Sequence, residues 1–194
     1  IVLVDDPTSL QAAINGAQDN KETEIKLGGD INLGDLIITR SAATLPIVIP
    51  ENKSIVLDLN GCKISAPYVE GSTTNHTYAF ENRGVLTIKG TKGEGEIVAR
   101  GIFNYGKMTL ESGTIKACDG NGGYGVRNYD GSEFVMNGGT VATIYEDSDI
   151  PGEGYDVCPI RVDEGAKAEI NGGIINNVSN FTVSIDNYGE TIVN

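Results

Sequence analysis

The chain has few cationic side chains, few cysteines and no long apolar segment. Without an apolar run of the length that a bilayer requires, the sequence predicts no membrane-spanning helix. Lys and Arg number 14 against 27 Asp and Glu residues, and the formal charge of -13 argues against nucleic acid and anionic membrane surfaces as partners. The same charge favours solubility and would repel an acidic polysaccharide unless calcium intervenes.

The three cysteines, Cys62, Cys118 and Cys158, show neither a metal-binding spacing nor a C-x-x-C motif. Three free or buried thiols are the simplest interpretation, and Cys62 falls inside a strand that we predict over residues 57–64. A Cys118–Cys158 disulfide stays open as an alternative, because both residues are expected near corners of the repeat described next. The odd count does not favour a disulfide framework.

Glycine, in contrast, is frequent, with 26 of 194 residues, and it marks regular corners. Five segments end in a short polar run and a glycine, and the closing glycines are separated by 22, 25, 34 and 24 residues: Gly84, Gly106, Gly131, Gly165 and Gly189. Each of the first four is followed by a short alternating strand, a second glycine and a further strand. A period in the twenties with two or three strands is typical of a solenoid.

Alternation within each strand predicts which side chains enter a common core. When the coils are superposed, the first strand of each contributes one inward column: Phe80, Ile102, Val126, Ile160 and Ile185. The second strand contributes Leu86/Ile88, Met108/Leu110, Phe134/Met136, Ala168/Ile170 and finally Ile192. The third contributes Ile97/Ala99, Ile115/Ala117, Val141/Thr143 and Ile175. Because like stacks on like, we expect parallel strands in register.

One corner of the repeat carries asparagine at equivalent positions: Asn82, Asn104, Asn128 and Asn187. Asparagine tolerates left-handed backbone and can hydrogen-bond to neighbouring turns. We therefore predict an asparagine ladder with a structural role, in preference to a catalytic one.

The N-terminal residues do not follow the repeat and predict a cap. Asp6 suits the N-cap of a helix and Pro7 its first position. The helix would have one apolar stripe: Leu10, Ala13, Ile14 and Ala17. Such a helix would cover the open end of a solenoid. We divide a single domain, residues 1–194, into the N-terminal strand and capping helix (1–20), irregular first coils (21–77) and regular repeats (78–194).

Three segments carry a family resemblance: SLQAAINGAQDNKETEIKLGGDINL, IPENKSIVLDLNGCKIS and the repeated NYG…GGT units. They resemble the right-handed parallel β-helices of the pectate-lyase-like superfamily, and most closely the β-helix modules of gut-bacterial surface proteins and of tailed-phage head-fibre, decoration and tail proteins. The resemblance covers nearly the whole chain. It implies an all-β fold, a right-handed parallel β-helix of about seven or eight coils. Function does not follow, because the superfamily holds lyases, hydrolases, adhesins and virion proteins.

The residues do not supply the catalytic groups that this resemblance would imply. Lyases of the superfamily use an acidic calcium cluster with an Arg or Lys base, and its hydrolases use grouped aspartates with a Gly-His-Gly motif. The single histidine, His76, has no flanking glycines and is interpreted as an exposed loop residue. Asp163 and Glu164 face Asp130 at a corner, but such neighbours arise by chance in an acidic chain. We predict that the protein is not an enzyme; a polysaccharide lyase or glycosidase is the alternative.

Two arginines are candidate binding residues. Arg127 and Arg161 are expected to stack in one outward column between Glu81, Phe103 and Asp186. They would form either a basic spot or, in the favoured interpretation, partners that neutralise nearby carboxylates.

The 34-residue coil carries an acidic protrusion, residues 144–156, with five carboxylates. Its spacing faintly resembles a calcium loop, so we consider calcium at Asp147, Asp149 and Glu153, with a solvated acidic loop as the favoured alternative. Four tyrosines near the protrusion are candidates for a sugar-binding or protein-binding surface, or are plain corner residues: Tyr124, Tyr129, Tyr145 and Tyr155. No other cofactor is expected.

The leading functional prediction is a non-catalytic rod in an extracellular assembly. A virion component, such as a head fibre or capsid decoration that contacts host glycans, is favoured over a bacterial surface adhesin. The chain begins in mid-strand at Ile1 and stops in mid-coil at residues 191–194. We therefore expect a longer chain or an oligomer, with further polypeptide covering the side chains near Ile175, Ile185 and Ile192.

Overall fold

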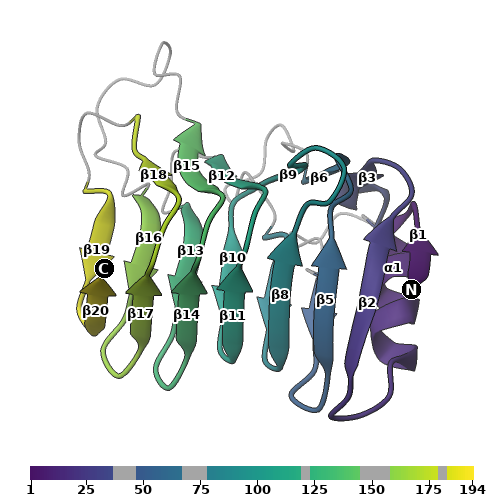
Figure 1. Cartoon of the computed structure of the whole chain (residues 1–194), viewed down its shortest axis with the longest axis horizontal. Helices are drawn as coiled ribbons and strands as arrows, with labels where there is room; N and C mark the ends of the chain where they lie inside the picture. Colours follow the sequence, from purple (N-terminus) through teal and green to yellow (C-terminus); the bar gives the residue numbers. More distant parts are fainter. Residues whose placement is uncertain (37–46, 67–77, 119–122, 145–157, 179–182) are drawn as a thin grey trace.

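The computed structural model describes residues 1–36, 47–66, 78–118, 123–144, 158–178 and 183–194. These residues form three parallel β-sheets, one α-helix and one short 3-10 helix, so the chain belongs to the all-β class. Helix α1 spans Pro7–Gly16, and the 3-10 helix η1 spans Leu33–Leu36. All strand pairs are parallel over the described residues (Figure 1), as the repeat predicts.

The chain visits the three sheets in a fixed order. Sheet A contains β1 (Val2–Val4), β2 (Glu22–Leu27), β5 (Ser54–Asp58), β8 (Val85–Lys89), β11 (Lys107–Leu110), β14 (Glu133–Met136), β17 (Lys167–Ile170) and β20 (Glu190–Val193). Sheet B contains β3 (Ile31–Asn32), β6 (Lys63–Ser65), β9 (Glu96–Ala99), β12 (Thr114–Cys118), β15 (Thr140–Ile144) and β18 (Ile174–Asn176). Sheet C contains β4 (Ile47–Ile49), β7 (Phe80–Asn82), β10 (Ile102–Asn104), β13 (Tyr124–Asn128), β16 (Cys158–Val162) and β19 (Ile185–Asn187).

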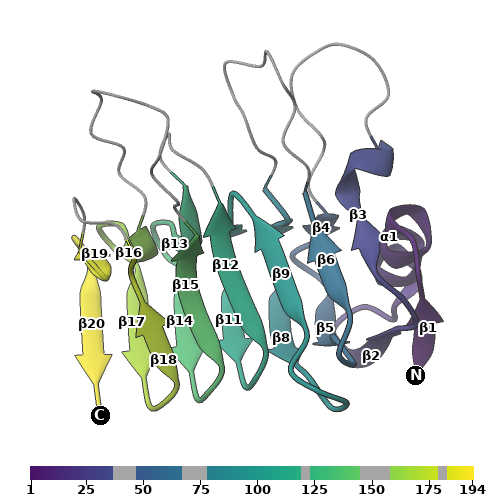
Figure 2. The ribbon, with the colours of Figure 1, turned by 90° about the horizontal axis from the view of Figure 1, so that it is seen from above.

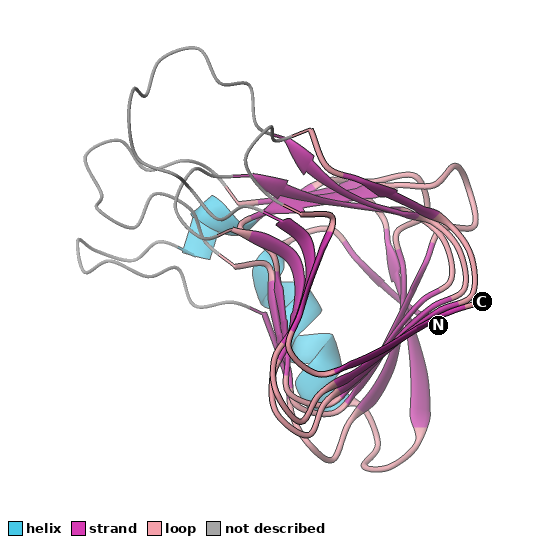
Figure 3. Ribbon diagram, turned by 90° about the vertical axis from the view of Figure 1, so that its left-hand side faces the viewer, coloured by secondary structure: helices cyan, strands magenta, loops and turns pink. Residues whose placement is uncertain are grey.

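From β2 onward, each passage adds one strand to sheet A, then one to sheet B and one to sheet C (Figure 2). The described strands make six such passages, with β1 and β20 as additional strands of sheet A. Seen along the stack, the three sheets surround a common interior (Figure 3). Side chains from all three sheets form one hydrophobic cluster that runs from Val4 to Ile170. The stack is therefore a rod with three long outer faces.

The predicted core columns are confirmed in nearly every coil. Phe80, Ile102 and Val126 lie in register on neighbouring strands and are fully buried. The columns of sheets A and B also pair as predicted, for example Leu86 with Met108 and Ile97 with Ile115. Neighbouring parallel strands within one sheet place equivalent residues of successive coils about 4.8 Å apart, so similar side chains fill each layer of the core.

The prediction for Ile192 is wrong. Ile192 pairs with Glu169, on the outer face of sheet A, and its side chain is 46% exposed. Thr191 and Val193 occupy the two inward positions instead, opposite Ala168 and Ile170. The parallel ladder between β17 and β20, which starts with the hydrogen bond from the Glu190 amide to the Ala166 carbonyl, places residue 192 at an outward position.

For the cysteines, the strand predicted around Cys62 is corrected, and the favoured interpretation of free thiols is confirmed at Cys62 and Cys158. The strand predicted over residues 57–64 is interrupted by a turn, because Asn60 and Gly61 adopt left-handed backbone with φ of 52° and 78°. Cys62 therefore lies in the turn before β6. Cys158 is a free, buried thiol, so the Cys118–Cys158 disulfide is not formed.

Helix α1 covers the N-terminal end of the stack, as predicted. Asp6 accepts hydrogen bonds from the amides of Thr8 and Ser9, at 2.9 and 3.0 Å. Leu10 and Ile14 are fully buried in the core. The side-chain amide of Gln11 donates to the Val48 carbonyl (3.0 Å) and accepts from the Val48 amide (2.8 Å). The helix thus satisfies backbone groups at the edge of β4 that would otherwise be open.

The predicted asparagine ladder exists, with three members. Nδ2 of Asn82 donates to Oδ1 of Asn104, and Nδ2 of Asn104 donates to Oδ1 of Asn128, both at 2.9 Å. All three side chains are fully buried. Val162 follows Asn128 in the column and separates it from Asn187, whose Oδ1 accepts from Thr191 instead. The predicted fourth member is therefore excluded by an aliphatic side chain.

A second row of amides lies at the exposed corner between sheets A and B. Asn137 donates to Glu111 (2.9 Å), Asn171 to Asn137 (3.0 Å) and Asn194 to Asn171 (2.6 Å). We call this set the exposed asparagine row. The recurring N-G-G corners at Asn137 and Asn171 carry this signal in the sequence, whereas the sequence prediction placed a ladder only at the other corner.

A buried carboxylate at the end of β5 links three neighbouring coils. Asp58 is fully buried and accepts from the backbone amides of Asn60 and Thr91 (2.9 and 3.0 Å), from the Thr91 hydroxyl (2.6 Å) and from Lys26 (3.3 Å). Burial alone would raise the pKa of Asp58, but these donors outweigh it and hold the pKa below its usual value.

The Asp58→Asn variant tests this network. Because the pKa of Asp58 is lowered on folding, the ionised carboxylate stabilises the fold above its unfolded-state pKa of about 4, and that contribution is lost as the pH falls through the lower folded-state pKa. We expect the variant to lose about 2 kcal/mol of unfolding free energy at pH 7 and to lose less of its remaining stability in acid than the parent. Urea titrations between pH 3 and 7 measure both; Glu164→Gln, at an exposed corner, is the control. An unchanged acid profile would contradict the assignment.

Candidate binding surface

The outer face of sheet C carries the predicted arginine column. The outward positions of five consecutive strands lie in register: Glu81, Phe103, Arg127, Arg161 and Asp186. Alternation along each strand forces these side chains outward, because the residues on either side of them enter the core or the asparagine ladder. The predicted stacking of Arg127 and Arg161 is confirmed.

Aromatic side chains from several coils meet on this face. The Phe103 ring contacts Tyr78 and lies edge-on to Tyr129, with 5.4 Å between ring centroids. Tyr129 in turn stacks on Tyr105 at 4.2 Å and 10°. The rings form a continuous chain across β7, β10 and β13, from the start of the strands to the corner that leads to sheet A.

Each described arginine lies over a tyrosine ring, with the guanidinium carbon 4.5 to 5.6 Å from a ring centroid. Arg127 covers Tyr129 at 4.5 Å, and Arg161 covers Tyr188 at 4.9 Å. All five tyrosines and all four arginines that the structure describes lie on or beside the strands of sheet C. We call this set, with Phe103, the Tyr–Arg strip: Tyr78, Arg83, Arg100, Phe103, Tyr105, Tyr124, Arg127, Tyr129, Arg161 and Tyr188.

Asp163 joins the two central arginines at the corner after β16. Its Oδ2 accepts from Arg127 Nε (3.0 Å), and its Oδ1 accepts from Arg161 Nε (2.7 Å). Arg161 also pairs with Asp186 at 3.0 Å. The favoured interpretation, that the arginines neutralise neighbouring carboxylates, is confirmed. These ion pairs connect β13, β16 and β19. In the same three strands, Val162 of β16 lies between Asn128 and Asn187 and interrupts the asparagine ladder.

The ionisation of the strip follows from its partial burial. Burial raises the pKa of Tyr78, Tyr124 and Tyr129, so their hydroxyls stay protonated at neutral pH. The hydrogen bond to Asp163 raises the pKa of Arg161. The strip therefore presents neutral phenols and fixed guanidinium–carboxylate pairs over the physiological pH range.

Access to the strip differs from residue to residue. Tyr188 is 62% exposed and Tyr105 is 36% exposed, whereas Tyr124 is buried and its hydroxyl accepts from Arg161 at 3.3 Å. The buried Tyr124 ring thus contacts both Arg127 and Arg161. Tyr105 is stacked on Tyr129 and covered by Arg83, so Tyr188 is the more open ring. Sequence reasoning named Tyr124 but missed Tyr105 and Tyr188, although both belong to repeated Asn-Tyr-Gly corners.

The remaining candidates lie outside the described residues: Tyr145, Tyr155, His76 and the calcium candidates Asp147, Asp149 and Glu153. The described residues contain no group of three or more His, Cys, Asp or Glu side chains arranged to hold a metal ion. Within the same residues no helix has the length and apolar character needed to cross a bilayer.

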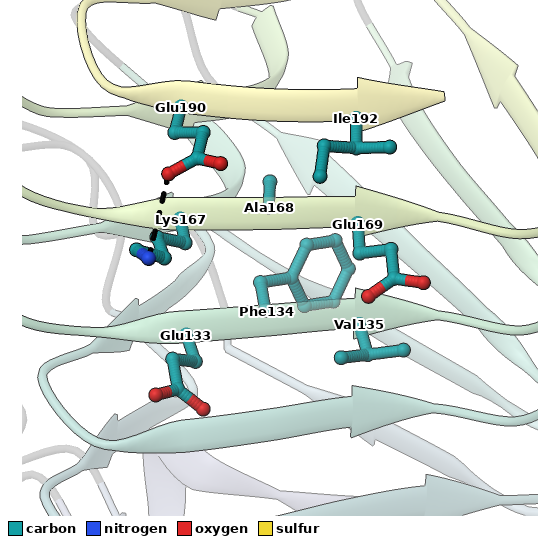
Figure 4. A pocket seen from close by; sticks show the side chains of 8 residues that line it. All are labelled: Glu133, Phe134, Val135, Lys167, Ala168, Glu169, Glu190 and Ile192. Atoms are coloured by element: carbon teal, nitrogen blue, oxygen red, sulfur yellow. Dashed lines mark ion pairs between the residues drawn. The ribbon is translucent and has the colours of Figure 1, made fainter. Parts of the chain in front are cut away.

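A separate depression lies on the outer face of sheet A, between β14, β17 and β20 (Figure 4). Its outward side chains include Val135, Glu169 and Ile192, and its rim carries Glu133 and the Lys167–Glu190 ion pair (3.4 Å); Phe134 and Ala168 lie behind it, with their side chains in the core. The volume of about 200 Å³ is below the range typical of small-molecule sites. We therefore assign no ligand to this depression.

Comparisons with protein-family models, with curated proteins and with solved structures find no match to this chain. The resemblance to the pectate-lyase-like superfamily therefore stays a prediction.

Proposed function

We propose that the protein is a non-catalytic binding rod, a right-handed parallel β-helix of the pectate-lyase-like type, whose ligand lies along the Tyr–Arg strip. The observation that carries this proposal is the segregation of every described tyrosine and arginine onto one face of a regular stack. Tyrosine and arginine dominate binding energy at recognition surfaces, because both give large contact areas and directed hydrogen bonds. A coiled stack of this kind holds them in fixed positions.

The chemistry of the strip supports binding over catalysis. Asp163 and the Cys158 thiol are the candidate base and nucleophile that we consider beside the strip. Asp163 is engaged by two arginines, and burial raises the pKa of Cys158 to about 12, which disfavours the reactive thiolate.

We further propose that the rod works within an extracellular assembly, with a phage virion as the favoured setting on the sequence resemblance and a bacterial cell surface as the alternative. Exposed apolar side chains of the last described coil support an additional polypeptide partner there: Ile174, Val183, Ile192 and Val193. Calcium at Asp147, Asp149 and Glu153 belongs to the same proposal as an optional ligand.

Polysaccharide assays separate this proposal from an enzyme. With calcium present, the purified protein is expected to release no unsaturated or reducing sugar from pectin, alginate or neutral glycans, because the strip contains no available acid–base pair. Sugar release and retention of the same glycans are measured in parallel, with heat-denatured protein as the control. Turnover that is lost in an Asp163→Asn variant would overturn the non-catalytic assignment.

A further inference from the structure

We propose that Tyr105 and Tyr129 form an oxidative modification site, at which a one-electron oxidant joins the two side chains by a carbon–carbon bond into dityrosine. Their rings stack with 4.2 Å between centroids and 10° between planes. No other two tyrosines stack on each other in the described part of the chain. The oxidant that we assign to this reaction is a haem peroxidase with hydrogen peroxide.

The stacking of the coils positions this pair. The Tyr105 amide donates to the Asn82 carbonyl at 2.7 Å, and the Tyr129 amide donates to the Asn104 carbonyl at 3.0 Å. The two tyrosines therefore occupy the same corner position in successive coils. The asparagine ladder fixes the residue before each of them, because Nδ2 of Asn104 donates to Oδ1 of Asn128. Successive coils are about 4.8 Å apart, a spacing that allows two rings to stack.

Face-to-face stacking is the orientation that radical coupling requires. In a tyrosyl radical, much of the unpaired spin lies on the ring carbons ortho to the oxygen, in π orbitals that point out of the ring plane. The nearly parallel rings of Tyr105 and Tyr129 direct these orbitals at each other. Burial raises the pKa of Tyr129, and a side-chain hydrogen bond with Tyr105 raises it further, so the two hydroxyls lie on the same side of the stack. The ortho carbons beside the hydroxyls are therefore neighbours as well.

The reaction balances with hydrogen peroxide as the only co-reactant. Each phenol loses one electron and one proton, and together they reduce one hydrogen peroxide to two water molecules. The two radicals form one bond between their ortho carbons, and the hydrogen on each of these carbons then moves to the oxygen of the same ring. Both hydroxyls are restored, and the protein has lost two hydrogen atoms.

The neighbours of the pair favour coupling within one chain. Arg83 covers the Tyr105 ring at 5.0 Å, and Arg127 covers the Tyr129 ring at 4.5 Å. The ring face that each tyrosine offers to another phenol is therefore the shared one. Tyr105 is 36% exposed, so the oxidant reaches this ring from solvent.

The new bond staples two coils at the corner that leads from sheet C to sheet A. It joins residues that are 24 positions apart in the sequence and so restricts the unfolded chain, as a disulfide over the same loop does. Among the described residues, Cys62 and Cys158 are free thiols and do not supply such a link.

The test is oxidation of the whole chain by peroxidase with limiting hydrogen peroxide, followed by peptide mapping. Trypsin and then endoproteinase Glu-C place Tyr105 in residues 101–107 and Tyr129 in residues 128–133, each as the only tyrosine of its peptide. We expect these two peptides to be cross-linked, with a mass two hydrogen atoms below their sum, and the protein to acquire dityrosine fluorescence. Because the coupling is intramolecular, the yield per chain should change by less than about twofold over an about tenfold dilution.

Two matched variants keep every aromatic ring. Tyr105→Phe removes one phenol of the pair and should lower the dityrosine fluorescence of the monomer by at least about fivefold. Tyr188→Phe removes a phenol that Asp163 separates from Tyr129 in the corner column, and it should leave the fluorescence unchanged. The melting temperature of each variant before oxidation verifies the fold. The parent oxidised in urea, where the stack is absent, is the control for the geometry.

Each outcome has one consequence. A cross-link between residues 105 and 129 that forms in the folded chain, resists dilution and is lost in urea supports the proposal. Dityrosine that joins other tyrosines, or only separate chains, overturns the site, and so does the absence of dityrosine where free tyrosine couples. An equal yield in urea refutes the role of the stack. The cross-linked protein should unfold at a higher urea concentration than the parent, and equal midpoints would overturn the stapling of the coils.

Discussion

Truncation of Phe80 to alanine is expected to lower the free energy of unfolding by about 4 kcal/mol. Phe80 is fully buried in the inward column of sheet C, where it lies between Ile47 and Ile102. Removing the ring leaves a cavity in a narrow core, and the neighbouring coils cannot collapse into it because their hydrogen-bonded spacing is fixed. Urea or guanidinium titrations followed by circular dichroism give the change in midpoint and slope.

The matched control is Phe103→Ala, one coil further along the same sheet but on its outer face. Phe103 is half-buried beneath Tyr78 and Tyr129, so we expect a loss of only about 1 kcal/mol. Equal losses for the two variants would contradict the assignment of inner and outer faces. A reduced slope in the Phe80 variant would indicate that the coils no longer unfold as one unit.

The asparagine ladder is expected to show the second large effect. In the Asn104→Ala variant, two donated hydrogen bonds disappear, to Oδ1 of Asn128 and to the Glu133 carbonyl, each at 2.9 Å. Asn82 also loses its acceptor. These groups are buried and cannot turn to water, so we expect a loss of about 3 kcal/mol in unfolding free energy.

The exposed asparagine row provides the comparison. Asn171 donates to Asn137 and accepts from Asn194, so it has the same pairing as Asn104, but at an exposed corner. Water replaces the lost partners there, and Asn171→Ala should change stability by less than about 0.5 kcal/mol. Similar losses at Asn104 and Asn171 would show that burial does not set the strength of the ladder.

A buried acceptor marks where the ladder begins. Oδ1 of Asn82 has no hydrogen-bond partner among the described residues, because Ile49 precedes it in the column. The ladder therefore starts against an isoleucine and ends before Val162. The ladder therefore links only the coils of β7, β10 and β13. The ion pairs of Arg127 and Arg161 link the coils of β13, β16 and β19 on the outer face.

The amino-acid sequence by itself determined the class of fold and most of the core. In-register parallel stacking places equivalent residues of successive coils next to each other, so a repeat read along the chain predicts contacts across space. The columns that begin at Phe80, Leu86 and Ile97 are confirmed for this reason. The capping helix could also be predicted from the sequence, because Asp6 accepts hydrogen bonds from amides only two and three residues away and Pro7 suits the first helical position.

Only the tertiary structure decided the register of the last strand and the composition of the binding surface. Ile192 faces outward because the backbone ladder of β20 with β17 pairs it with the outward Glu169. Tyr105 and Tyr188 look like plain corner residues in the sequence. They join the arginines in one strip because the stacking of coils brings distant residues into contact. Asn82 and Asn104 are 22 positions apart in the sequence, and Arg127 and Asp163 are 36 positions apart, yet each pair is hydrogen-bonded. Local patterns encode which face a side chain occupies, whereas its partners depend on the lengths of the coils between them.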